Sequence, residues 1–204
     1  MVGKIYIMST GYDPTKGKHV NDPFLGPEPT LGACRPDFRE RLGKGDHIFV
    51  VTGKVRNESQ LVLAGFEVAE KISAYEAYER FPQHRLRELE DGQITGNVIV
   101  TASGEQHELD NHNQFERRAQ NYIVGANPIA LSTHEEIDEG RLQTLDILRD
   151  IFQTEGDSVM QIMGRHHNMS EAQIIKMRDY LDEIKRAARP LTPGQSLAGR
   201  QARA

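Results

Sequence analysis

The chain of 204 residues contains no tryptophan and a single cysteine, Cys34. One cysteine excludes an intramolecular disulfide and any zinc site with more than one cysteine ligand. No stretch approaches the roughly 18 consecutive apolar residues of a membrane span, and the apolar run at the N-terminus is too short for a signal peptide. These absences predict a soluble protein of a reducing, cytoplasmic compartment, with no membrane partner.

The chain also lacks an excess of positively charged residues. The formal net charge is -5, and the sequence pI is about 5.9. This balance argues against a broad basic surface of the kind that holds duplex DNA without sequence specificity. Among nucleic-acid ligands, a nucleotide or a single exposed base therefore fits better than a long duplex.

Strand signals dominate the first two thirds of the chain. Residues 10–29 interrupt them with four prolines and three glycines, a composition that predicts a long loop. Loops of this length inside compact domains are usually functional. Strands are expected at 4–9, 46–52, 61–72, 96–101, 121–125 and 129–132, with the second and third forming a hairpin, and short helices at 36–42 and 74–81, the latter capped by Ser73 and Glu76.

From Thr133 the pattern becomes helical. Thr133 and Ser170 are N-caps of two amphipathic helices, the first with an apolar stripe that includes Leu142, and residues 159–164 form a turn between them. We interpret the basic junction formed by Arg165, His166 and His167 as a solvated turn. The predicted class is α+β, divided into 1–132, a C-terminal helical segment at 133–187 that offers a homodimer surface, and a disordered tail at 188–204.

The sequence around Cys34 favours a binding corner. Arg35 precedes a proline-started helix, and the strand at 46–52 ends at Thr52, Gly53 and Lys54. Arginine and lysine hold phosphate, and a threonine hydroxyl with a glycine amide suits a polar ligand. The alternatives are a solvated basic pair and an ordinary strand end.

The loop at 10–29 supplies flat and amide side chains. Tyr12 and Phe24 lie where an aromatic has little structural reason to be, so they are candidates for stacking on a base. Asn21 offers a donor and an acceptor together and suits a base edge, whereas an Asx turn ahead of Pro23 explains it equally well.

Two further clusters carry weaker signals. Cys34 beside Arg35 suits a thiolate, with His47 as the nearest base in sequence, but a buried structural thiol is the favoured interpretation. His107, Asp110 and His112 match no metal-site spacing. We therefore assign no catalytic residue, no metal and no cofactor.

Taken in order, several segments resemble the nucleotide modification associated domains of the Nmad2 type. The resemblance covers about residues 4–132 and rests on the order of individually weak motifs. Its segments are the Tyr-containing first strand, 21–26, 30–39, 45–48, 52–53, 61–68, the helix with Tyr75 and Tyr78, 96–99 and 118–124. This family is similar to the PUA, ASCH and EVE group of small β-barrels.

The resemblance implies a PUA/EVE-like mixed β-barrel with flanking helices. It also implies recognition of a modified nucleotide or base, in phage DNA modification or anti-phage defence. The ligand would lie between the loop at 10–29 and the strand end at Gly53, as a free nucleotide or as part of a nucleic acid. The alternatives are a nucleotide-processing enzyme that uses Cys34 or His47 with Asp110, a protein that sequesters a nucleotide signal, and a helical interaction module.

Overall fold

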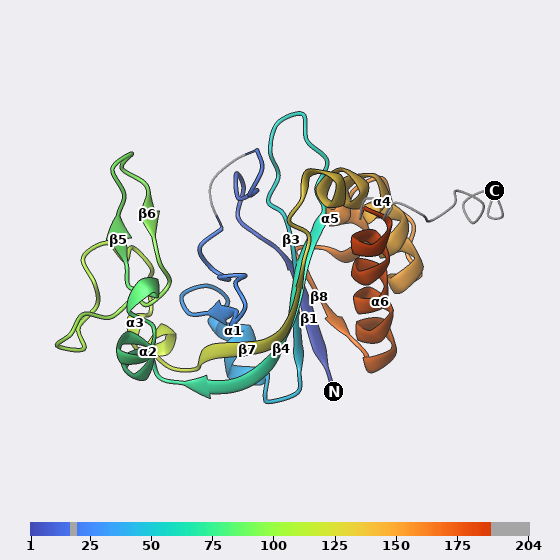
Figure 1. Ribbon diagram of the computed structural model, residues 1–204. Helices are drawn as coiled ribbons and strands as arrows, with labels where there is room; N and C mark the ends of the chain where they lie inside the picture. Colours follow the sequence, from blue (N-terminus) through green and yellow to red (C-terminus); the bar gives the residue numbers. More distant parts are fainter. Residues whose placement is uncertain (17–19, 189–204) are drawn as a thin grey trace, which may run out of the picture.

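The computed structural model describes residues 1–16 and 20–188 and has a mixed six-stranded sheet at its centre (Figure 1). The strand order is β2-β7-β4-β3-β1-β8, with β1 and β3 parallel and the other neighbouring pairs antiparallel. A separate two-stranded ribbon pairs β5 with β6. The strands are β1 (Gly3–Ile7), β2 (Thr30–Leu31), β3 (His47–Val51), β4 (Val62–Ile72), β5 (Arg87–Glu88), β6 (Ile94–Thr95), β7 (Tyr122–Ala130) and β8 (His166–Met169).

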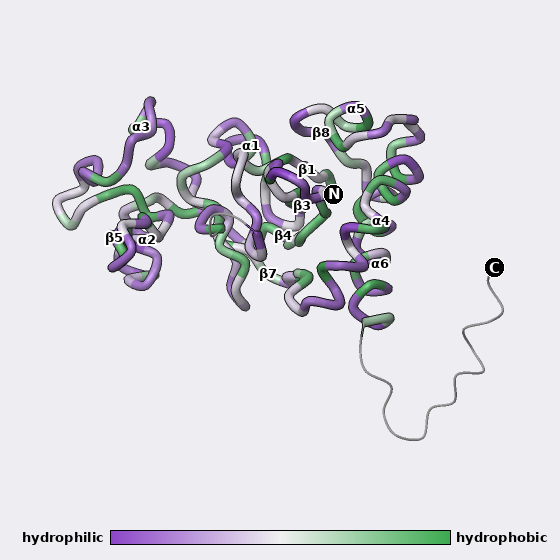
Figure 2. Tube along the Cα trace, turned by 90° about the horizontal axis from the view of Figure 1, so that it is seen from above, coloured by the Kyte–Doolittle hydropathy of each residue, from purple (hydrophilic) through white to green (hydrophobic). Residues whose placement is uncertain are grey.

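Helices fall into two groups on either side of this sheet. Seen from above (Figure 2), α4 and α6 lie toward one end of the molecule, and α2, α3 and β5 toward the other. None of the helices within 1–16 and 20–188 is long and apolar enough to cross a membrane. The helices are α1 (Pro36–Arg41), α2 (Ala74–Arg80), the 3-10 turn η1 (Pro82–His84), α3 (Phe115–Arg118), α4 (His134–Phe152), α5 (Val159–Met163) and α6 (Glu171–Ala187).

The sheet is open, with β2 and β8 at its two edges. The described residues form no closed barrel, so the predicted barrel was wrong, whereas the α+β class is confirmed. The likeness to PUA/EVE domains stays a prediction. A barrel requires the first and last strands of the sheet to pair. Here β2 is only two residues long, and β8 pairs only with β1.

Local signals located most elements correctly. The hairpin is confirmed by the antiparallel pairing of β3 with β4, and complete capping boxes begin α2, α4 and α6 at Ser73, Thr133 and Ser170. The strand expected at 96–101 is replaced by isolated bridges at Val98 and Val100. The two strands expected after residue 121 form one, β7, whose pairing with β4 contains register shifts.

The main core lies between the sheet and helices α4–α6. Side chains of β1 and β3, such as Ile5 and Phe49, share it with Met177 and Leu181 of α6. Leu142, expected in the apolar stripe of α4, is instead 77% exposed, while Gly140 and Thr144 face inward. The C-terminal segment thus shares the core of the sheet, and the apolar faces considered for a dimer are covered by it.

The junction before α6 is a strand, so the expected solvated turn at 165–167 was wrong. In β8, His166 pairs with Tyr6 and Met169 with Gly3 of β1. The signal was hidden because β8 is short and its first three residues are exposed. The tail expected at 188–204 begins at the cap residue of α6, Ala188, and 189–204 lie outside the described residues.

A second, smaller core lies beyond the far end of β4 and β7, which curve away from the central sheet (Figure 1). It gathers Ala77 and Phe81 of the α2 region, Val98, Val100 and Tyr122 of β7. The molecule therefore has two packed centres joined by a pair of long strands. Such a junction is a place where a concave surface can form.

Candidate ligand-binding site

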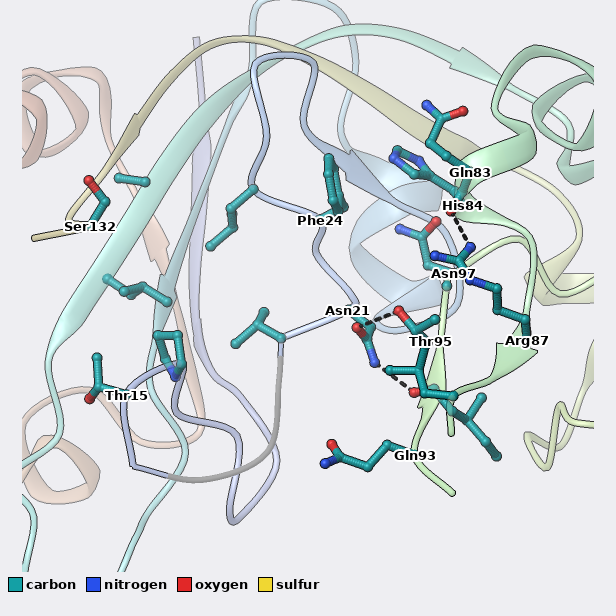
Figure 3. Close-up of a pocket in the computed structure, with 18 of the residues that line it drawn as sticks. Thr15, Asn21, Phe24, Gln83, His84, Arg87, Gln93, Thr95, Asn97 and Ser132 are labelled. Carbon is teal, nitrogen blue, oxygen red and sulfur yellow. Dashed lines mark hydrogen bonds between the residues drawn. The ribbon is translucent and has the colours of Figure 1, made fainter. Parts of the chain in front are cut away.

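A pocket of about 760 Å³ lies between the two cores (Figure 3). One wall is the loop that carries Asn21 and Phe24, and a second is the segment 83–97. The third comes from the main core, with Leu63, Leu131 and Ile137. Pockets of roughly 300–1,000 Å³ with mostly apolar linings and a few polar groups are typical of small-molecule sites.

An aromatic stack forms part of the pocket wall. The ring of Phe24 lies 4.3 Å from the His84 ring, and His84 lies 5.3 Å from Phe81. Phe81 in turn stacks at 6.0 Å against Tyr122. Phe24, 38% exposed, is the outer member of this series. The exposed part of its ring is available to a further flat ring.

A buried hydrogen-bond network supports this wall from behind. The Asn97 amide donates to Thr30 Oγ1 at 2.9 Å and to Asp22 Oδ1 at 3.1 Å. The Tyr122 hydroxyl donates to Asn97 Oδ1 at 2.8 Å. Because Asn97, Thr30 and Tyr122 are all buried, these bonds fix the wall in one geometry.

Asp22 joins the pocket to the Cys-Arg-Pro segment. Its carboxylate accepts from the backbone N–H groups of Gly32 at 2.7 Å, Ala33 at 3.0 Å and Cys34. Burial raises the pKa of the Cys34 thiol, and the neighbouring Asp22 carboxylate raises that pKa further. Since the thiolate is the nucleophilic form, this cysteine is a structural thiol.

The Asn21 side chain closes the pocket wall. Its amide nitrogen donates to the Ile94 carbonyl at 2.8 Å, and its oxygen accepts from the Thr95 hydroxyl at 3.1 Å (Figure 3). Both ends of the amide are therefore engaged by β6. Asn21 lies at the expected place, but it ties the loop to β6 with the groups that were expected to read a base edge.

The charge of the lining is positive. Arg87 contributes the one permanent charge among the described lining residues, and no carboxylate lines the described wall. Arg87 is exposed, and its guanidinium donates at 2.8 Å to the carbonyl of Gln83, another lining residue. A guanidinium without a neighbouring carboxylate suits an anionic ligand group such as phosphate.

Four of the remaining predicted residues meet at a separate corner, where the loop packs directly on the end of β3. Gly53 N–H donates to the Tyr12 carbonyl at 2.8 Å, and Gly11 N–H donates to the Lys54 carbonyl at 3.1 Å. A Cβ at Gly53 would collide with the Ser9 carbonyl oxygen, so glycine is required for this approach. Tyr12, Thr52, Gly53 and Lys54 are absent from the described pocket lining.

Arg35 also lies outside the pocket lining, and its charge is paired with a carboxylate of the same chain segment. Its guanidinium pairs with Asp37 at 2.7 Å and stacks 3.7 Å from the Phe38 ring centre. The residue has a positive φ of 51° at the N-cap of α1. Of the seven predicted binding residues, the structure thus brings Asn21 and Phe24 into one pocket and leaves Arg35 out.

Sequence reasoning missed the second wall of the pocket. His84 and Arg87 lie in a polar connection with little periodicity, and Asn97 lies in the strand expected at 96–101. The available signal was the PQH turn after α2, which places His84 directly behind Phe81. Burial of Asn97 depends on Asp22 and Tyr122, which are distant in sequence.

The polar segment before α3 contains a hydrogen-bonded His–Asp pair. His112 Nδ1 lies 2.6 Å from Asp110 Oδ1. Burial would raise the pKa of Asp110, but hydrogen bonds from His112 and Gln106 outweigh burial and lower it. Within residues 1–16 and 20–188, no group of three or more histidine, cysteine, aspartate or glutamate side chains is arranged to hold a metal ion.

Comparisons with protein-family models, with curated proteins and with solved structures each found no match.

Proposed function

We propose that this protein binds a nucleotide, or a nucleic-acid base, in the pocket between Phe24 and Arg87. The ligand base stacks on the ring of Phe24. The phosphate faces Arg87 at the rim. The pocket is large enough for a base that carries a modification, which fits the expectation of a modified nucleotide in DNA modification or defence.

The observation that carries this proposal is the exposed end of the aromatic stack. Phe24 is one of the few large apolar side chains exposed to solvent, and it is held against His84 at 4.3 Å. Stacking on an aromatic side chain contributes about 1–3 kcal/mol per base, whichever base is bound.

Arg87 supports an anionic ligand over a neutral one. It is the one permanent charge among the described lining residues, and no carboxylate there competes with a phosphate. A guanidinium also binds phosphate in two-pronged geometry. A nucleoside monophosphate should therefore bind more tightly than its nucleoside.

The chemistry of the described pocket favours binding without turnover. Neither the raised-pKa thiol of Cys34 nor the Asp110–His112 pair is among the described lining residues. Recognition or sequestration of a nucleotide is thus better supported than hydrolysis or group transfer. Recovery of the unchanged nucleotide after heat release from the protein would distinguish these outcomes.

The test is a thermal-shift series on the full chain with nucleosides and their monophosphates, combined with native mass spectrometry of the purified protein. A ligand present at 100 times its Kd stabilises the folded state by about 2.7 kcal/mol, which raises the melting temperature by several degrees. If no nucleoside or nucleotide raises it, and none copurifies, the proposed function is wrong.

A further inference from the structure

His84 has a ring nitrogen that no described group satisfies. The side chain is only 5% exposed although it lines the pocket. Its Nε2 atom is buried and has no hydrogen-bond partner among residues 1–16 and 20–188. A buried polar atom without a partner costs about 1–3 kcal/mol. At the wall of a pocket, such an atom indicates a partner supplied by the ligand.

The hydrogen bonds behind His84 have a defined direction. Asp22 Oδ1 accepts from Gly32 N–H at 2.7 Å and from Asn97 at 3.1 Å. The Asn97 amino group therefore points toward Asp22, which leaves the Asn97 carbonyl to accept from Tyr122 at 2.8 Å. The Tyr122 hydroxyl proton is thus engaged with Asn97, and its oxygen can offer other groups only lone pairs.

This direction assigns the tautomer of His84. Nδ1 lies 3.4 Å from Tyr122 Oη and 3.4 Å from Thr30 Oγ1. Burial raises the pKa of Tyr122, and hydrogen bonding from the Thr30 hydroxyl opposes this rise, so we assign the Thr30 hydroxyl proton to the Tyr122 oxygen. Both oxygens therefore face Nδ1 as acceptors, which places the ring hydrogen on Nδ1 and a lone pair on Nε2.

Burial keeps the His84 ring neutral. It lowers the pKa of the imidazole, and the aromatic rings on both faces contribute to this burial. Nε2 is then an acceptor fixed in orientation by the rings of Phe24 and Phe81. A ligand that satisfies it must bring an N–H or O–H group in the plane of the imidazole.

We propose that His84 Nε2 selects ligands whose ring edge carries an amino group, that is, amino-purine or amino-pyrimidine nucleotides. The proposal rests on the proposed function and names its ligand class. The amino group donates to Nε2 while the ring lies against Phe24. Since Phe24 covers His84 in the ligand-free structure, its side chain turns aside on the loop when the base enters.

The test uses pairs of nucleosides that differ only in the amino group. Adenosine is compared with purine riboside, and cytidine with the riboside of pyrimidin-2-one, by calorimetric titration of the full chain. One buried hydrogen bond of this kind corresponds to about tenfold in affinity. The amino compound of at least one pair should therefore bind about tenfold more tightly.

Variants at His84 connect this preference to the imidazole. His84→Phe keeps a ring between Phe24 and Phe81 but removes both nitrogens, so the preference for the amino compound should disappear. His84→Gln retains an acceptor and should keep part of the preference. His167→Phe makes the same substitution at an exposed histidine of β8, outside the described lining, and should leave the preference intact.

The outcomes separate this inference from the proposed function. Equal binding of amino and amino-free nucleosides to the natural chain overturns the selection by His84 while leaving nucleotide binding in place. A preference that persists in a folded His84→Phe variant also overturns it. Failure of every nucleoside and nucleotide to bind overturns the proposed function itself. If His84→Phe does not fold, the comparison within each nucleoside pair on the natural chain and on His84→Gln decides.

Discussion

Two regions of this protein contain the same kinds of side chains and use them differently. At the corner where residues 9–16 meet the end of β3, Thr52 and Gly53 are bonded to other parts of the chain. At the pocket, Phe24 presents an exposed part of its ring and His84 an unsatisfied nitrogen. Residue type alone therefore does not mark a site. What distinguishes a site is polar and aromatic capacity that the fold leaves unused.

The loop side of the corner is held by a buried ion pair. Arg141 of α4 donates to Asp13 Oδ2 at 2.7 Å and to Thr15 Oγ1 at 2.9 Å, and it also reaches the Ser59 carbonyl. The Asp13 side chain is 1% exposed and that of Arg141 is 9% exposed. If the corner is structural, changes here should lower stability, whereas changes in the pocket should lower affinity.

The largest effect is expected for Arg141→Met. This variant keeps the apolar stem but leaves the Asp13 carboxylate buried without its partner, which costs about 3–5 kcal/mol for a broken buried pair. Urea unfolding followed by circular dichroism measures the loss. A change below about 1 kcal/mol would contradict the structural role of the pair.

Asp13 should also make stability depend on pH. Burial alone would raise the pKa of Asp13, but hydrogen bonds from Arg141 and Thr15 outweigh burial and lower it. A lowered native pKa stabilises the fold fully above the unfolded value, near pH 4, and this contribution is lost as pH falls through the native pKa. The stability difference between the natural chain and Asp13→Asn should therefore be largest near pH 7 and shrink toward pH 3. A constant difference across that range would count against the pair.

Thr52→Val should have a smaller effect at the same corner. Thr52 Oγ1 accepts from the Leu61 backbone N–H at 3.0 Å, and the side chain is fully buried. Loss of this bond leaves the N–H unpaired and costs about 1–3 kcal/mol of unfolding free energy. Nucleotide affinity of the folded variant should not change. A loss of nucleotide affinity without a loss of unfolding free energy would show that Thr52 contacts the ligand.

Phe24→Ala should give the opposite result. The variant removes the stacking face, which corresponds to about tenfold in nucleotide affinity within the range for one stacked base. Because Phe24 is 38% exposed, unfolding free energy should change little. Calorimetric titration and urea unfolding of the same preparation measure both quantities. Unchanged affinity would remove the aromatic stack from the site.

Much of the fold was predictable because local rules apply strongly in this chain. Ser73, Thr133 and Ser170 begin helices where capping rules place them, and continuous apolar runs locate β3 and β4. The missed strand β8 depends on pairing with β1, which is more than 150 residues away in sequence. Pairing of this kind leaves no periodic signal in a four-residue segment.

The candidate site was predictable only in part. Phe24 was identified because an aromatic in a proline- and glycine-rich loop has few structural reasons to be there. Arg35 and Lys54 were selected for charge, yet the Arg35 guanidinium stacks on Phe38. The role of His84 depends on Asn97 and on the donor–acceptor direction of the hydrogen bonds that link Asn97 to Asp22. Such a network is invisible until distant segments are placed together.

The most direct measurement compares two cations, one from each region. A nucleoside monophosphate that binds the natural chain is titrated calorimetrically into Arg87→Gln and Lys54→Gln. We expect Arg87→Gln to weaken binding of the monophosphate about tenfold and to leave binding of the corresponding nucleoside unchanged. Lys54→Gln should change neither affinity. A loss of phosphate affinity in Lys54→Gln, with Arg87→Gln unaffected, would contradict the account and move the site to the strand-end corner.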